Sequence, residues 1–181
     1  MMFFFLALFI IILCIIALFS FPQFSPIPYF PSNMKDKEII LAGLNIKNDQ
    51  TIFDLGAGDG VVIFEAAYEA LKHRLNTRFV ALEINPILIT LMYIKWLLHP
   101  NRKNVKIVWG DMFKIKFKSQ MSNVKRITFY LYISPWLIEK VITRIKKQIP
   151  HAQYVSYYYP IKSLKKKEVI REGVHTLYLY E

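Results

Sequence analysis

The start of the chain carries no charged side chain. This divides the sequence into an apolar part suited to lipid and a charged part suited to water. No Asp, Glu, Lys or Arg occurs before Lys35, so all 37 charged side chains, 24 basic plus 13 acidic, lie in residues 35–181. Residues 1–21 are apolar apart from Ser20. About 20 helical residues, at a rise of about 1.5 Å each, cross a hydrocarbon core of about 30 Å. The pattern therefore predicts a transmembrane anchor over residues 1–21.

A cleaved signal peptide and a buried helix of a soluble protein are the alternatives to an anchor. A signal peptide would begin with basic residues and have a shorter apolar core, and a helix without a polar face is uncommon in a soluble protein. The first basic residues, from Lys35 onward, follow the apolar segment. This flank predicts a single-pass membrane protein whose domain faces the cytoplasm. Prolines in residues 22–34 predict a linker, and residues 35–181 suit one folded domain.

Apolar runs and helical patterns alternate along residues 35–181. Ser32 is expected to cap a short amphipathic helix around residues 39–44. The expected strands are residues 51–55, 79–84, 105–110, 126–133 and 153–159. Helical patterns cover residues 61–75 and begin again at Asn85-Pro86 and Ser134-Pro135, where proline suits the first helical position. Residues 167–172 and 174–181 are expected to form a hairpin at one edge. The order predicts an α/β fold, an open and mainly parallel seven-strand sheet with helices on both faces.

In such a sheet, ligands bind at the carboxyl ends of the strands, and the first of these ends is rich in glycine. It reads Asp54-Leu-Gly56-Ala-Gly58-Asp59-Gly60. A dinucleotide fingerprint would need glycine or alanine one residue later, where the chain has valine. The two carboxylates would also repel a pyrophosphate. They suit a cationic ligand, and S-adenosylmethionine (SAM), which carries ammonium and sulfonium groups, is such a ligand.

Acidic residues also follow the second and third strands. Glu83 comes 23 positions after Gly60, close to the spacing expected of an acid that binds ribose hydroxyls. Asp111 is expected to accept a hydrogen bond from the adenine amino group, with Met112 covering the ring. The predicted cofactor site is therefore Asp54, Gly56, Gly58, Asp59, Glu83, Asp111 and Met112.

These three motifs together resemble the class I, Rossmann-like SAM-dependent methyltransferases with seven-strand sheets. A wider set, PYFPS at 28–32, DLGAGDG at 54–60, LEINP at 82–86 and TFYLYISPW at 128–136, is similar to a family of small membrane-anchored protein-lysine methyltransferases. That family includes the enzymes that methylate the ATP synthase c subunit. The resemblance implies protein-lysine N-methylation with a membrane protein as substrate and the lipid bilayer as a further partner.

The remaining features concern the methyl acceptor and other ligands. Methylation of a lipid or small molecule such as a quinone, and a non-catalytic SAM-binding scaffold, remain alternatives. Aromatic faces attract ammonium groups, so Tyr132 and Trp136 are the predicted acceptor-site residues. The histidines are dispersed and no metal site is expected. The lysines are scattered without a nucleic-acid-binding module, so nucleic acid is not an expected partner.

Overall fold

The computed structural model describes residues 2–20, 29–120 and 125–181. Within these ranges it describes all side chains except those of residues 17–20. Within these ranges the α-helices are α1 (Met2–Ser20), α2 (Lys37–Leu44), α3 (Val61–Lys72), α4 (Pro86–Leu98) and α5 (Pro135–Gln148). The strands are β1 (Gln50–Leu55), β2 (Arg78–Glu83), β3 (Val105–Trp109), β4 (Arg126–Leu131), β5 (Gln153–Tyr157), β6 (Lys166–Ile170) and β7 (Leu177–Tyr180). Short 3-10 helices are η1 (Met34–Asp36), η2 (Arg102–Asn104) and η3 (Phe117–Gln120).

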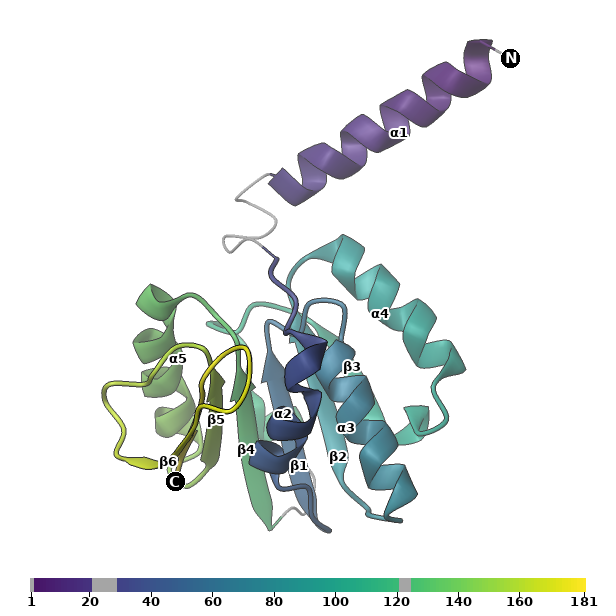
Figure 1. Ribbon diagram of the computed structural model, residues 1–181. Helices are drawn as coiled ribbons and strands as arrows, with labels where there is room; N and C mark the ends of the chain where they lie inside the picture. Colours follow the sequence, from purple (N-terminus) through teal and green to yellow (C-terminus); the bar gives the residue numbers. More distant parts are fainter. Residues whose placement is uncertain (1, 21–28, 121–124) are drawn as a thin grey trace.

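The strands form one mixed seven-stranded sheet in the order β3-β2-β1-β4-β5-β7-β6 (Figure 1). Strands β1 to β5 pair in parallel, and β7 runs antiparallel to both β5 and β6. The expected hairpin is confirmed, with β7 lying between β5 and the edge strand β6. The strand order reverses between β1 and β4, and this switch point is where an open α/β sheet forms its binding crevice.

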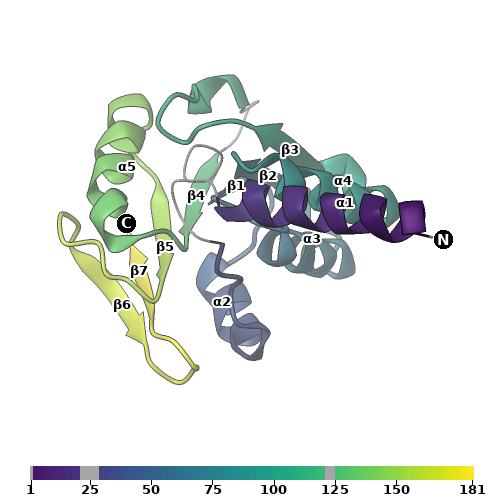
Figure 2. The same cartoon turned by 90° about the horizontal axis from the view of Figure 1, so that it is seen from above.

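Two apolar cores lie on the two faces of the sheet. Helices α2, α3 and α4 contribute Leu44, Ile63 and Met92 to one core, and α5 and η3 contribute Val141 and Phe117 to the other. Figures 1 and 2 show these helices on opposite sides of the strands. Neighbouring β1 residues alternate between the two cores, as the period of two in a strand requires. The expected coverage of both faces is confirmed.

The helix starts follow the predicted signals only in part. Asn85 caps α4, since its Oδ1 accepts from the Ile87 amide at 2.9 Å, and Pro86 is the first helical residue. The expected cap at Ser32 is wrong. The side chain of Asn33 caps η1 instead, while the Ser32 hydroxyl is buried against that of Tyr130 at 2.9 Å. A buried hydroxyl facing a distant strand leaves no pattern in the local sequence.

The N-terminal segment forms α1, a 19-residue helix with exposed apolar side chains. Among the residues that the structure describes, no helix has the length and hydropathy of a membrane span. The transmembrane anchor predicted over residues 1–21 is therefore not found. Both ends of that range, Met1 and Phe21, lie outside the described residues, as does most of the predicted linker.

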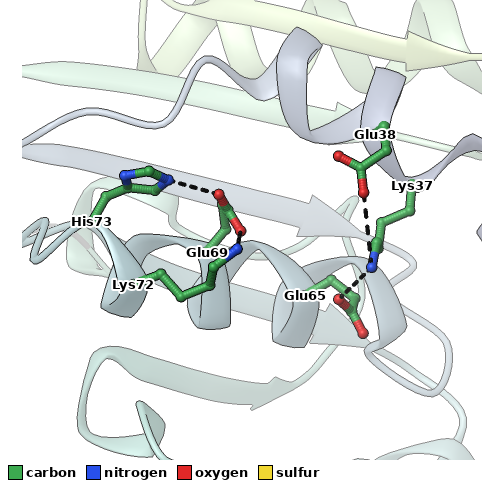
Figure 3. Close-up of polar contacts among 6 residues, drawn as sticks. All are labelled: Lys37, Glu38, Glu65, Glu69, Lys72 and His73. Atoms are coloured by element: carbon green, nitrogen blue, oxygen red, sulfur yellow. Dashed lines mark hydrogen bonds and ion pairs between the residues drawn. The ribbon is translucent and has the colours of Figure 1, made fainter.

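Polar contacts join the outer surfaces of α2 and α3 (Figure 3). Lys37 of α2 lies 3.6 Å from Glu65 of α3, and Glu69 pairs with Lys72 and His73 along α3. Such exposed pairs contribute little to stability, about 0–1 kcal/mol each.

The buried carboxylate of Asp36, which directly precedes α2, joins segments far apart in the sequence. Asp36 Oδ2 accepts from the Tyr157 hydroxyl at 2.6 Å and from the His175 amide at 2.9 Å, while Oδ1 accepts from the Val174 amide at 2.6 Å. Burial opposes ionisation, but these hydrogen bonds outweigh it and hold the pKa of Asp36 below its usual value. One residue thus fixes α2 to the end of β5 and to the loop before β7.

We expect Asp36→Ala to lower the free energy of unfolding by about 2–4 kcal/mol, because it leaves a buried hydroxyl and two amides unpaired. The depressed pKa means that this contribution is present above about pH 4 and is lost as the pH falls further. Urea unfolding at pH 7 measures it. Glu38→Ala is the control, since Glu38 is exposed and its ion pair with Lys37, at 3.9 Å, is long. Equal unfolding midpoints for the two variants would contradict the assignment.

Candidate active site

A cleft opens at the carboxyl ends of β1 to β4, on both sides of the switch point. It encloses about 740 Å³ of empty space, counting its open mouth. The polar and glycine residues lining it come from three successive strand ends: Gly56, Glu83, Gly110 and Asp111. A smaller hollow beside it is lined by Asp54, Gly58 and Asp59, among others. The structure therefore brings the three predicted motifs together.

The glycine loop has a backbone that only glycine adopts easily. Gly56, Gly58 and Gly60 have φ angles of +77°, +60° and +78°, in the left-handed region that disfavours side chains. The amides of Gly56 and Ala57 both donate to the Leu82 carbonyl at 2.9 Å, which ties the loop to β2. A Cβ on Gly58 would lie 2.5 Å from the Tyr29 ring. The glycines thus allow a tight turn with another chain segment against it.

Glu83, the last residue of β2, organises this turn. Its Oε2 accepts from the Gly58 amide at 2.8 Å, and its Oε1 accepts from the amides of Ile84 and Asn85 at 2.8 and 2.9 Å. A carboxylate has about four acceptor positions, so these three amides leave one position on Oε2, and Glu83 lines the cleft. Glu83 can accept a ligand hydroxyl while it holds the loop.

Among the residues that the structure describes, no cation and no hydrogen-bond donor pairs with the carboxyl group of Asp54. It is buried in β1, and burial together with the negative charges of Glu83 and Asp59 raises its pKa to about 8. At neutral pH its neutral form therefore predominates. A cation placed beside it would reverse that balance, because an opposite charge favours ionisation.

Asp59, the second carboxylate of the glycine loop, has a cationic partner. Its carboxylate forms an ion pair with Lys95 of α4 and accepts from the Val61 amide at 3.3 Å. It therefore connects the glycine loop to α4 in this conformation, and its predicted contact with a ligand stays a prediction. The sequence analysis missed Lys95, which lies 36 positions away with no recognisable motif.

The third strand end presents a carboxylate and two apolar side chains. Asp111 Oδ1 accepts from the Phe113 amide at 2.8 Å, and Lys114 lies 3.9 Å from Oδ2. Met112 and Phe113 line the cleft next to it, and Met112 reaches to 3.6 Å from the position of a Cβ on Gly56. This combination suits a flat heterocycle with an exocyclic amine.

The segment before α2 covers one side of the cleft. Tyr29 and Phe30 line it. Burial, followed by the charge and hydrogen bonding of Asp59, raises the pKa of Tyr29 to about 12. The contact between Ser32 and Tyr130 anchors the segment to β4.

The two predicted acceptor residues occupy different places. Tyr132 lines the cleft directly after β4 and packs edge-on against Tyr157, with ring centroids 5.0 Å apart. Trp136, near the start of α5, is 76% exposed and does not appear among the residues lining the cleft. In the part of the chain that the structure describes, no three His, Cys, Asp or Glu side chains are grouped as metal ligands.

Comparison with solved structures shows that the fold of this chain recurs in other proteins. An RNA methyltransferase from Salinibacter ruber, solved with S-adenosyl-L-homocysteine, has a TM-score of 0.68 and 21% identity, covering 83% of this chain and 92% of its own. A precorrin-6y C5,15-methyltransferase from Geobacter metallireducens has a TM-score of 0.59 and 16% identity, covering 82% and 86%. The chain has the class I methyltransferase fold.

Sequence comparison adds one relative of interest to this fold. A protein-lysine N-methyltransferase of Saccharolobus islandicus (strain REY15A) is 28% identical over 159 residues, which cover 85% of this chain and 92% of the relative. No family model matches the sequence.

We expect Asp54→Asn to stabilise the protein at neutral pH, because a carboxyl group whose pKa rises on folding costs stability as it ionises. The gain should grow between about pH 4 and pH 8 and reach the order of 4 kcal/mol at pH 7, because each of the roughly three pH units above the ordinary pKa adds about 1.4 kcal/mol. Thermal unfolding across this pH range measures it.

Asp49→Asn serves as the control, since hydrogen bonding to Asn76 and Lys125 holds the pKa of Asp49 below its usual value and the substitution should not stabilise. A melting temperature for Asp54→Asn at pH 7 below that of the natural chain would contradict the raised pKa of Asp54 and its cost in stability.

Proposed function

We propose that this chain is a SAM-dependent methyltransferase that transfers the methyl group to a lysine side chain of a protein. The observation that carries the proposal is the buried, uncompensated carboxyl of Asp54 beneath a glycine turn at the switch point, with Glu83 and Asp111 beside it. The fold and the 28% identical protein-lysine N-methyltransferase support the same assignment.

The residues present fit this cofactor by charge and by shape. When bound, SAM supplies a methyl group on a positively charged sulfur. Asp54 would stabilise the cationic amino acid part through the glycine turn, and the free position on Glu83 Oε2 would accept from a ribose hydroxyl. Asp111 would accept from the adenine amine, with Met112 and Phe113 on the ring faces.

The acceptor side of the cleft needs to hold and neutralise a lysine. An unperturbed lysine has a pKa of about 10.4, and partial burial among aromatic rings favours the neutral amine. Tyr132 contributes such a surface, and its own pKa is raised by burial and then by the nearby Tyr159 and Tyr158. Alignment of the amine with the methyl group at about 3–3.5 Å can supply much of the rate enhancement.

We also propose that the acceptor lysine belongs to a protein at a membrane, with the domain on its cytoplasmic side. The exposed apolar side chains of α1 support this proposal, since a surface of this kind favours contact with lipid.

Mass spectrometry of membranes from the source cells, incubated with the purified chain and deuterated SAM, tests the acceptor. We expect label on lysines of membrane proteins. Tyr132→Ala should lower the rate at least tenfold while the dissociation constant for SAM changes less than threefold. Tyr68→Ala, which replaces an exposed tyrosine of α3, is the control. Label confined to the lipid extract would contradict the proposal and favour a lipid acceptor.

Cofactor binding should release a proton from Asp54. Its pKa of about 8 in the free protein falls when a cation binds beside it, so the affinity for SAM should rise with pH between about 6 and 8. Calorimetry at pH 7 in buffers of different ionisation enthalpy counts the protons. We expect the natural chain to release close to one more proton per bound SAM than Asp54→Asn does. The variant serves as the reference because it accounts for the ligand's own titration. Equal proton release by both proteins would exclude this role of Asp54.

A further inference from the structure

Helix α4 has an apolar surface on both sides. Its inner side chains, including Leu88, Ile89 and Met92, are buried in the core. Its outer side chains are also apolar, and Leu98 and Ile94 are 84% and 55% exposed. The exposed set, which we call the α4 face, consists of Leu91, Tyr93, Ile94, Leu97 and Leu98. A helix at the surface of a water-soluble domain normally places polar residues there.

The charged residues of the segment that contains the α4 face have one sign, and one of them, Lys95, is already paired with Asp59. Between Glu83 and Asp111 every charged residue is basic: Lys95, Arg102, Lys103 and Lys106. Trp109, 67% exposed, lies at the end of this stretch. Apolar helix surfaces flanked by lysine, arginine and aromatic residues bind at the boundary between headgroups and acyl chains, and each cation near an anionic leaflet adds about 1 kcal/mol.

The position of α4 agrees with such contact. Figures 1 and 2 both show α1 extending away from the sheet on the side of the molecule where α4 lies. Helices α1 and α4 are therefore on the same side of the domain. A single lipid surface can meet both.

We propose that the α4 face docks on the surface of an anionic lipid bilayer. A second copy of the chain is the less suitable occupant, because two α4 faces opposed to each other would bring their basic residues together. Docking does not depend on the methyltransferase activity. Helix α4 starts three residues after Glu83, so where the proposed function also holds, the cleft lies near the bilayer and its acceptors lie at that surface.

Site-specific fluorescence tests the contact in the full chain reconstituted into vesicles. Cys14 is the single cysteine, so a Cys14→Ser background carrying Leu98→Cys accepts one environment-sensitive NBD label. In vesicles of phosphatidylcholine and phosphatidylglycerol at a 3:1 ratio, we expect lipid-borne nitroxide to quench the label at 98 at least twofold more than a label introduced by Leu71→Cys. Leu71 is a partly exposed apolar residue of α3 and serves as the matched control.

The substitution Ile94→Glu should reduce quenching at position 98 to the level of position 71, and pure phosphatidylcholine vesicles should reduce it partly. Equal quenching at 98 and 71 in the anionic vesicles would overturn the proposal. A blue shift at 98 that depends on protein concentration in detergent without vesicles would overturn it in favour of self-association. Loss of SAM binding or methyl transfer would leave these readings unchanged, so the two proposals fail separately.

Discussion

The hydrogen bond from the Gly58 amide to Glu83 is the contact on which the cleft depends. It joins the turn after β1 to the end of β2 at 2.8 Å, beside the switch point between β1 and β4. The same carboxylate also accepts hydrogen bonds from the amides of Ile84 and Asn85, the first residues of the segment that leads to α4. A charge-assisted hydrogen bond to a backbone amide is stronger than a neutral one. One side chain therefore sets the shape of the cleft floor and the start of the helix beside it.

The charged groups at the cleft are opposite in sign to the net charge of the chain. The formal net charge is +11, yet three carboxyl groups gather around the glycine turn. Burial and the two neighbouring charges keep Asp54 protonated at neutral pH. Groups with strongly perturbed pKa values are a common feature of functional sites.

Much of this arrangement could be predicted from the sequence, because it depends on local pattern. The strand ends carrying Asp54, Glu83 and Asp111 were recognised from apolar runs followed by glycine or acid, and the start of α4 from Asn85-Pro86. Contacts between distant segments could not be predicted in this way. Asp36 with Tyr157, Ser32 with Tyr130 and Asp59 with Lys95 join residues 121, 98 and 36 positions apart. The identity of such partners depends on the tertiary fold, and single residues carry no periodic signal.

Helix α4 connects the site to the outside of the molecule. Its first turn follows directly on Glu83, its Lys95 holds Asp59 of the glycine loop, and its inner face packs on the sheet. Its outer apolar side chains are not needed for any of these contacts, and a surface of that kind is costly in water. Retaining it is understandable if the same rigid element that positions the cleft also meets an apolar environment. The orientation of the cleft relative to that environment would then be fixed by a helix and would not depend on the segment that follows α1.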